Sequence, residues 1–287
     1  MTPRHAYVVL DVFTDVPLQG NPVAVFTAAD GLSADVMQRA ARELNLSETV
    51  FLLGAGEAGD GDADARVRIF TPAVELPFAG HPVLGTAFVV GARTGADEVR
   101  LRTGAGVVPI TLRREGGEIV FGEMSQPIPR WESYDRAGEL LAALGVAEAA
   151  LPIEVYDNGP RHVIVAVDDP QIVSDLRPDL GALRDLGALG VSCCAMTGER
   201  TVLTRMFAPA LGVAEDPATG SAAGPLALHL ARHGRTAFGG RIEIHQGAEI
   251  GRPSILHAGA EGSGDAVTRV AVGGGAVVVA GGEYRLD

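Results

Sequence analysis

The chain has 287 residues, a hydrophobic fraction of 47% and a formal net charge of −13 at pH 7. This length suits one large domain or two of ordinary size, and the apolar content suffices for a substantial core. The acidic balance argues against nucleic acid and against an anionic membrane surface as partners, because neither attracts a negative protein. All 23 basic residues are arginine, which excludes Schiff-base chemistry on lysine and the lysine of a phosphate-binding P-loop.

The only two cysteines, Cys193 and Cys194, are adjacent in the sequence. Two neighbouring thiols form neither a zinc site by themselves nor a framework of disulfides, so we expect small buried residues in a strand. The first residues lack the charged start and sustained apolar run of a signal peptide, and no stretch is apolar enough to span a membrane. These features favour a cytoplasmic protein without a membrane partner.

Strands and one amphipathic helix are predicted in the first 70 residues. β-branched and aromatic residues predict strands over residues 6–13 and 23–26, with turn residues between them. Residues 33–44 predict a helix, because Ser33 suits the N-cap position and apolar residues follow it at helical spacing. Further strands are predicted over residues 48–53 and 66–70.

Two apolar helices are each expected to begin beside a glycine. After His81, Pro82 suits the first helical position, and the buried helix that follows can end at Gly91. The second helix has Ser221 as its expected N-cap and can end at Gly234.

Similar segments recur along the chain. "RIFTPA" at Arg68 resembles "RMFAPA" at Arg205, and "GNPVAVF" at Gly20 resembles "GPRHVIV" at Gly159. Gly20 and Arg68 are 48 positions apart, and their counterparts Gly159 and Arg205 are 46 positions apart. This spacing predicts a duplicated domain, with halves at residues 1–126 and 127–287 and a last strand that can return to the first half.

The duplication predicts an α+β fold with two pseudo-repeated domains. Each half would be a mostly antiparallel sheet wrapped around its own apolar helix. The two helix starts are then expected to face one another across a cleft. Their unpaired N–H groups and the positive ends of the helix dipoles would suit a small carboxylate substrate.

Three side chains beside these elements are candidate catalytic groups. Glu48 begins an apolar strand. If its side chain faces a dry cleft, its pKa would rise and it could transfer protons. If it faces solvent, it would be an ordinary surface carboxylate. His81 either acts in the site or only caps its helix. Asp216 stands before a proline, where aspartate often only starts a turn. His162 follows a glycine turn, and its orientation stays open. Because His81, His162 and His229 lack metal-ligand spacing, no metal site is expected.

The chain resembles the phenazine-biosynthesis isomerase family, PhzF, from near residue 7 to near residue 255. The resemblance rests on "GNPVAVF", "ARELNLSETVFL", "RIFTPAVELPFAGHPVLGTA", "QPIPRW", "NGPRHV", "EDPATGSAAGPLALHLARHG" and "IEIHQGAEIGRPS". It implies a fold like that of diaminopimelate epimerase, a homodimer and no cofactor. The epimerase and proline racemase relatives use two cysteines, but the corresponding loops here, "FAGH" and "DPATGS", contain none. Two-thiol racemisation is therefore not expected.

The resemblance also implies roles for particular residues. The family's acid/base carboxylate falls on Glu48, and its histidine and aspartate fall on His81 and Asp216. The loops that hold the substrate carboxylate match Gly80, Gly220 and Ser221. Pro217 departs from the small residue expected at its position, which removes an N–H and affects substrate fit.

The implied reaction converts trans-2,3-dihydro-3-hydroxyanthranilate to its aminoketone tautomer in phenazine biosynthesis, with Glu48 moving a proton from C3 to C1. Two alternatives stay open. One is a related isomerase or epimerase of another small amino or hydroxy acid. The other is a non-catalytic protein that binds small acids.

Overall fold

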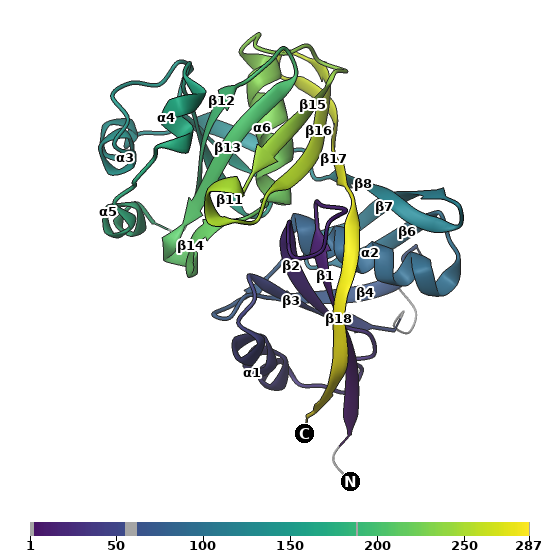
Figure 1. Cartoon of the computed structure of the whole chain (residues 1–287). Helices are drawn as coiled ribbons and strands as arrows, with labels where there is room; N and C mark the ends of the chain where they lie inside the picture. The colour runs from purple at the N-terminus through teal and green to yellow at the C-terminus, as the bar shows by residue number, and fades with distance from the viewer. Residues whose placement is uncertain (1–2, 55–61, 188, 287) are drawn as a thin grey trace. The chain divides into compact units, whose positions relative to one another are not determined.

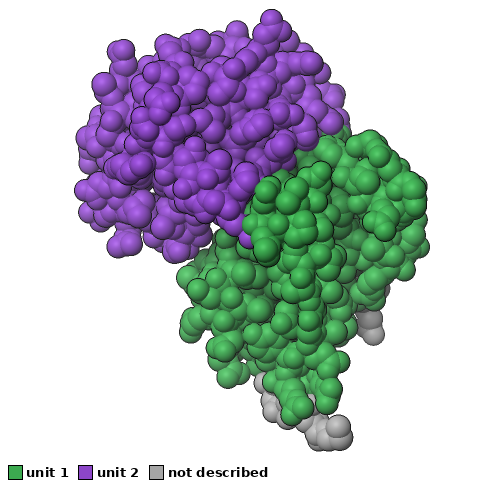
Figure 2. Space-filling model, viewed as in Figure 1, with its two compact units in different colours: residues 1–125, 273–287 green, residues 126–272 purple. Residues whose placement is uncertain are grey.

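The computed structural model describes residues 3–54, 62–187 and 189–286. The chain divides into two compact units (Figure 2): unit 1 contains Met1–Ser125 and Gly273–Asp287, and unit 2 contains Gln126–Val272. Both units combine strands with a few helices, so the predicted α+β class is confirmed. No helix among the described residues is both long and apolar enough to cross a membrane.

Unit 1 contains most of the first eight strands, the last strand and two helices. Their bounds are β1 (Arg4–Val12), β2 (Asn21–Phe26), α1 (Ala34–Leu44), β3 (Glu48–Leu53), β4 (Ala65–Phe70), β5 (Glu75–Leu76), α2 (Gly80–Thr94), β6 (Glu98–Thr103), β7 (Gly106–Glu115), β8 (Glu118–Gln126) and β18 (Ala276–Arg285). β1 pairs antiparallel with both β2 and β18, so the two ends of the chain lie side by side (Figure 1).

The helix α2 is the central element of unit 1. It contacts β1, β2, β3, β6 and β7, and its residues from Gly80 to Gly91 are all buried. The amphipathic α1 packs Met37 and neighbouring apolar residues against Phe26 and Phe51 of the sheet. α1 begins after its predicted N-cap: the Ser33 side chain accepts a hydrogen bond from the Val36 N–H group.

The predicted ends of α2 are partly wrong. Pro82 is the third residue of the helix rather than the first, but it still lies in the first turn, where its missing N–H removes no helical bond. The helix continues past Gly91 to Thr94 and is capped by Gly95, which has a φ of 75°. Gly91 serves close packing instead, since a Cβ there would lie 2.3 Å from the Leu112 side chain.

Unit 2 repeats a curved sheet around a buried helix. Its elements are β9 (Arg130–Ser133), α3 (Ala137–Leu144), β10 (Glu154–Asp157), β11 (Arg161–Ala166), α4 (Pro170–Ser174), α5 (Leu180–Asp185), β12 (Gly190–Met196), β13 (Thr201–Ala208), η1 (Pro209–Leu211), β14 (Val213–Asp216), α6 (Gly220–Arg232), β15 (Arg241–Gln246), η2 (Ala248–Ile250), β16 (Ser254–Ser263) and most of β17 (Ala266–Gly274). α6 packs against β11, β15 and β16, and Figure 1 shows it behind the last two of these strands.

The short helices α3, α4 and α5 contribute a separate apolar layer to unit 2. Leu140, Val173 and Leu183 of these helices form one buried cluster with residues of β11 and β12. Cys193 belongs to this cluster, and Cys194 beside it is also buried. Both thiols are free, and burial raises the pKa of Cys193 to about 12. The prediction of small buried strand residues is confirmed.

The two similar segments of the sequence make the same ion pair. Arg68 on β4 binds both carboxylate oxygens of Glu75 at 2.7 Å. Arg205 on β13 binds both carboxylate oxygens of Glu215, at 2.8 and 2.7 Å. In each unit the bidentate pair ties a strand to the segment that leads into the buried helix, so the repeated sequence positions the repeated helix start.

Candidate active site

Glu48 and His81 meet inside unit 1. Glu48 is the first residue of β3, and His81 is the second residue of α2. The Nε2 atom of His81 lies 3.4 Å from the Oε2 atom of Glu48, and only 4% and 15% of the two side chains are exposed. The strand pairing that places Val23 opposite Glu48 fixes where the carboxyl group stands.

The imidazole of His81 is neutral in this environment. Burial lowers its pKa to about 3, although a hydrogen bond to the backbone of Pro22 opposes the shift. Because proline has no N–H group, the imidazole must donate this bond to the Pro22 carbonyl. With Nε2 turned towards Glu48, the donor is Nδ1. The remaining nitrogen, Nε2, then presents a lone pair that can accept a hydrogen bond from a protonated Glu48.

Asp216 lies at the end of β14 in unit 2, within a ring of buried hydrogen bonds. Its Oδ2 atom accepts a bond from the Thr219 hydroxyl at 2.5 Å. The Gln246 side-chain amide donates to the Asp216 carbonyl at 2.7 Å and accepts from the Thr219 N–H group at 3.1 Å. These bonds hold the turn between β14 and α6 in one conformation, with the aspartate carboxylate fixed by the turn.

Ser221 is paired with the histidine whose orientation the sequence left open. The Ser221 hydroxyl lies 3.0 Å from Nε2 of His162, and burial lowers the pKa of that histidine to about 4. The prediction of Ser221 as N-cap is wrong. The cap is Thr219, α6 begins at Gly220, and Ser221 is its second residue, so its hydroxyl is available to His162.

Pro225 inside α6 changes the bonding of the first turn. Its missing N–H would otherwise donate to the carbonyl of Ser221, four residues earlier. That carbonyl instead accepts a bond from the Asn158 side-chain amide at 2.9 Å. One residue earlier, the Gly220 carbonyl accepts a bond from Gln126 at 2.7 Å. Two side chains distant in sequence therefore hold the start of the helix.

Both helix starts leave backbone donors that no cap side chain uses. Ala79, the N-cap of α2, carries no polar side chain, and the Thr219 hydroxyl caps no N–H of α6. Gly80 and Gly220 are the first residues of their helices, where the dipole is positive. Each start is chemically suited to an anionic oxygen.

Strand register shows how the two units differ at equivalent positions. In unit 1 the parallel pairing of β2 with β3 sets Val23 opposite Glu48. In unit 2 the parallel pairing of β11 with β12 sets His162 opposite Gly190. The carboxylate position of the first unit is thus a glycine in the second, and a histidine side chain occupies the space. A Cβ on Gly190 would lie 2.5 Å from Nδ1 of His162.

We expect Gly190→Ala to destabilise the protein, because the added methyl group displaces a buried imidazole and weakens its contact with Ser221. Overpacking of this kind costs about 1–3 kcal/mol, measured as the loss in free energy of unfolding by urea. Gly138→Ala is the matched control: a Cβ there meets nothing within 4 Å, and its site in α3 favours alanine. Equal stabilities of the two variants would contradict this account.

The structure also shows a titratable cluster that the sequence interpretation missed. His229 and His233 have the i, i+4 spacing of metal ligands, although only the first was considered for it. Their ring nitrogens and a carboxylate oxygen of Glu154 lie within 4.8 Å of one another. However, Arg232 donates to the same Glu154 oxygen at 2.7 Å, and so does the Tyr156 hydroxyl. Hydrogen bonds from His229, His233 and Tyr156 and the charge of Arg232 outweigh the effect of burial and lower the pKa of Glu154, so the group is a buried ion-pair network that ties β10 to the end of α6.

The fold is that of a known class of racemases and epimerases. A solved structure described as a probable proline racemase from Agrobacterium radiobacter is 13% identical, with a TM-score of 0.70 over 99% of this chain and 93% of that one. A solved Pseudomonas aeruginosa protein described as a predicted epimerase is 34% identical, with a TM-score of 0.82 over 98% and 99% of the two chains. The epimerase-like fold expected from the sequence is confirmed.

The family is defined more narrowly by sequence. A family model described as "Phenazine biosynthesis-like protein" matches residues 10–282. The chain belongs to this PhzC-PhzF family. It is 55% identical to trans-2,3-dihydro-3-hydroxyanthranilate isomerase of Pseudomonas aeruginosa, over 98% of this chain and all of that protein.

Proposed function

We propose that the protein is a cofactor-independent isomerase that converts trans-2,3-dihydro-3-hydroxyanthranilate to its aminoketone tautomer in phenazine biosynthesis. The observation that carries the proposal is the contact of Glu48 with the buried, neutral His81 at 3.4 Å. The full-length similarity to an isomerase of that name supports the choice of substrate.

Glu48 would act as both base and acid. Its carboxylate removes the proton from C3 of the ring, the electron pair moves through the diene, and the same carboxyl group returns a proton to C1. The resulting enol then becomes the ketone. One group can serve both carbons only if it lies over one face of the ring, near both. His81 stays neutral, and its Nε2 can accept a hydrogen bond from the protonated Glu48 between the two steps.

The remaining residues would bind the substrate. We assign the amine and the hydroxyl of the substrate to Asp216 and His81. A carboxylate and a neutral imidazole can each form hydrogen bonds with these substrate groups. Gly80, Gly220 and Ser221 would hold the carboxylate through the donors at the helix starts. Fixed N–H groups there would also stabilise negative charge that develops in the transition state. A homodimer in the cytoplasm is part of the same proposal.

The direct test is incubation of the wild-type protein with trans-2,3-dihydro-3-hydroxyanthranilate in D₂O, followed by ultraviolet absorption and product mass. We expect rapid loss of the diene absorption and deuterium in the ketone product. Unchanged substrate without any bound complex would reject this substrate, and other small unsaturated amino or hydroxy acids would be tested next. Binding without exchange of any substrate C–H bond would instead indicate a non-catalytic acid-binding protein.

A further inference from the structure

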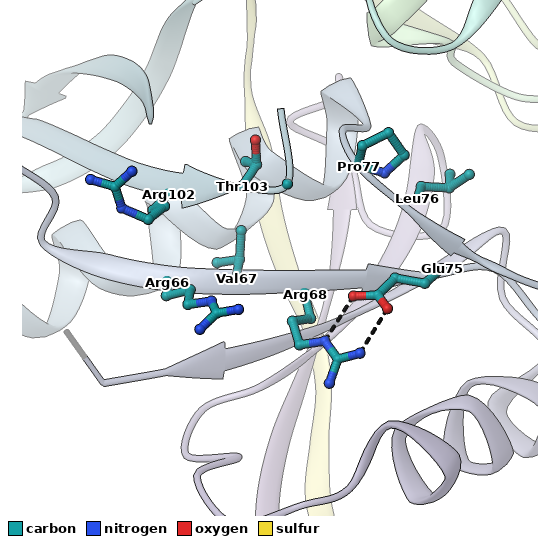
Figure 3. A pocket seen from close by; sticks show the side chains of 9 residues that line it. Arg66, Val67, Arg68, Glu75, Leu76, Pro77, Arg102 and Thr103 are labelled. Carbon is teal, nitrogen blue, oxygen red and sulfur yellow. Dashed lines mark hydrogen bonds and ion pairs between the residues drawn. The ribbon is translucent and has the colours of Figure 1, made fainter. Parts of the chain in front are cut away.

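A cavity of unit 1 lies apart from the Glu48–His81 pair. It has a volume of about 460 Å³, which is within the usual size range of small-molecule sites. Neither Glu48 nor His81 lines it. Its lining includes residues of β4, β5 and β6, shown in Figure 3, notably Arg66, Arg68, Glu75, Leu76, Pro77 and Arg102.

The cavity forms where the sheet opens. Along β4, Ala65 and Arg66 pair with β6, whereas Ile69 and Phe70 pair with β5. Val67 and Arg68 lie between these two pairings. The strand neighbours diverge there, and Pro77 and Gly104 close the gap by packing together, since a Cβ on Gly104 would lie 3.0 Å from the Pro77 Cα. The result is a hollow with an apolar end at Leu76 and Pro77 (Figure 3).

The lining carries an excess of positive charge. Three of its residues are arginines and one, Glu75, is acidic. Arg68 is neutralised by Glu75 through two bonds of 2.7 Å, and Arg102 is paired with Asp62, which lies outside the lining. Arg66 is exposed, and the described part of the chain provides no ion-pair partner for it. In a protein with a net charge of −13, this is a local concentration of cations.

The arrangement places like charges side by side. Arg66 pairs directly with Arg102 across the parallel strands β4 and β6, and cross-strand cations repel one another. Arg66 and Arg68 extend from the same side of β4 (Figure 3), with Arg68 held by Glu75 and by its stacking at 5.1 Å over Phe70. A bound anion would relieve this repulsion. Because Glu75 and Phe70 already hold the Arg68 side chain in place, that side chain would lose little conformational entropy when the anion binds.

We propose that this cavity binds a small organic acid, independently of the isomerase reaction. Arg66 holds the acid group, the neighbouring guanidinium groups of Arg68 and Arg102 contribute to the positive field, and Leu76 and Pro77 contact the apolar part of the ligand. Arginine suits this role because its planar fork binds carboxylate through two parallel hydrogen bonds.

The test is calorimetric titration of the full-length protein with benzoate, and separately with acetate. We expect benzoate to bind more tightly than acetate, since only benzoate reaches the apolar end. Arg66→Gln should weaken the benzoate affinity at least about tenfold, the effect of losing roughly one charge-assisted interaction. It should not lower thermal stability, because Arg66 forms no ion pair with another described residue and its removal relieves the repulsion of Arg102.

Arg113→Gln on β7 is the matched control, since it removes one exposed arginine of the same unit outside the cavity. We expect less than a twofold change in its benzoate affinity. Equal affinities of wild type and Arg66→Gln would overturn the proposal, as would equal weakening by the two variants, which would mean general attraction by net charge. Benzoate bound elsewhere on the protein would appear as a component that Arg66→Gln does not change; if that component is the only one, the proposal fails.

Discussion

Glu48→Gln is expected to lower kcat by about 10²–10⁴-fold, the usual contribution of one positioned acid/base group. Glutamine keeps the shape of the side chain and its place at the start of β3, but it cannot carry a proton between C3 and C1. KM should change little, because the proposed carboxylate-binding donors belong to the helix starts. Initial rates of loss of the diene absorption measure both parameters.

Glu98→Gln is the matched control, because Glu98 also opens a strand of unit 1 but is exposed. It should retain wild-type turnover. Glu48→Asp should give an intermediate rate, since it retains the carboxyl group but withdraws it by one methylene from the substrate and from His81. Wild-type turnover in a folded Glu48→Gln protein would reject Glu48 as the proton carrier and leave the identity of the substrate untouched.

Arg205→Met is expected to lower the free energy of unfolding by about 3–5 kcal/mol, the cost of leaving one partner of a buried ion pair without the other. Only 7% of the Arg205 side chain and 12% of the Glu215 side chain are exposed. Arg205 also donates to the Leu176 carbonyl at 2.9 Å, so the substitution leaves a second buried group without its donor. Urea denaturation of wild type and variant measures the loss.

The duplicated fold supplies an internal control for this prediction. Arg68 makes the same bidentate pair in unit 1, but 23% of its side chain and 42% of the Glu75 side chain are exposed. Arg68→Met should therefore cost at most about 1 kcal/mol, as for other solvated pairs. Arg205→Met/Glu215→Leu should recover much of the lost stability, because it removes the uncompensated carboxylate. Equal losses in Arg68→Met and Arg205→Met would show that burial does not govern these pairs.

The three candidate catalytic residues could be predicted from the sequence, because each stands at the boundary of a recognisable element. Glu48 begins an apolar strand, His81 stands at the start of an apolar helix, and Asp216 lies in the "EDPATGS" turn. Their catalytic roles stay predictions. Their supporting residues carry no such local signal. Gln246 joins Asp216 from 30 positions away, and Gln126 reaches the Gly220 carbonyl from 94 positions away.

The sequence by itself determined the class of fold and the repeated framework. Periodicity, glycine turns and the recurring Arg-x-Phe segments are local properties, and each predicts an element or a repeat without knowledge of its neighbours. The absence of lysine likewise restricted the chemistry directly. The beginning of α1 could be assigned in the same way, because Ser33 and the apolar stripe that follows it act within one helix.

Only the tertiary structure decided which side chains meet and what charge they carry. The neutral state of His81 follows from burial by several elements, which outweighs the opposing effect of the bond to Pro22, and neither influence is visible in "FAGH". Gly91 marks a close contact within α2 rather than its end, because Leu112 of another strand leaves no room there for a Cβ. The arginine cavity likewise requires that β4 pair with β5 and β6 in succession. These properties arise between segments far apart in the chain, so no local pattern encodes them.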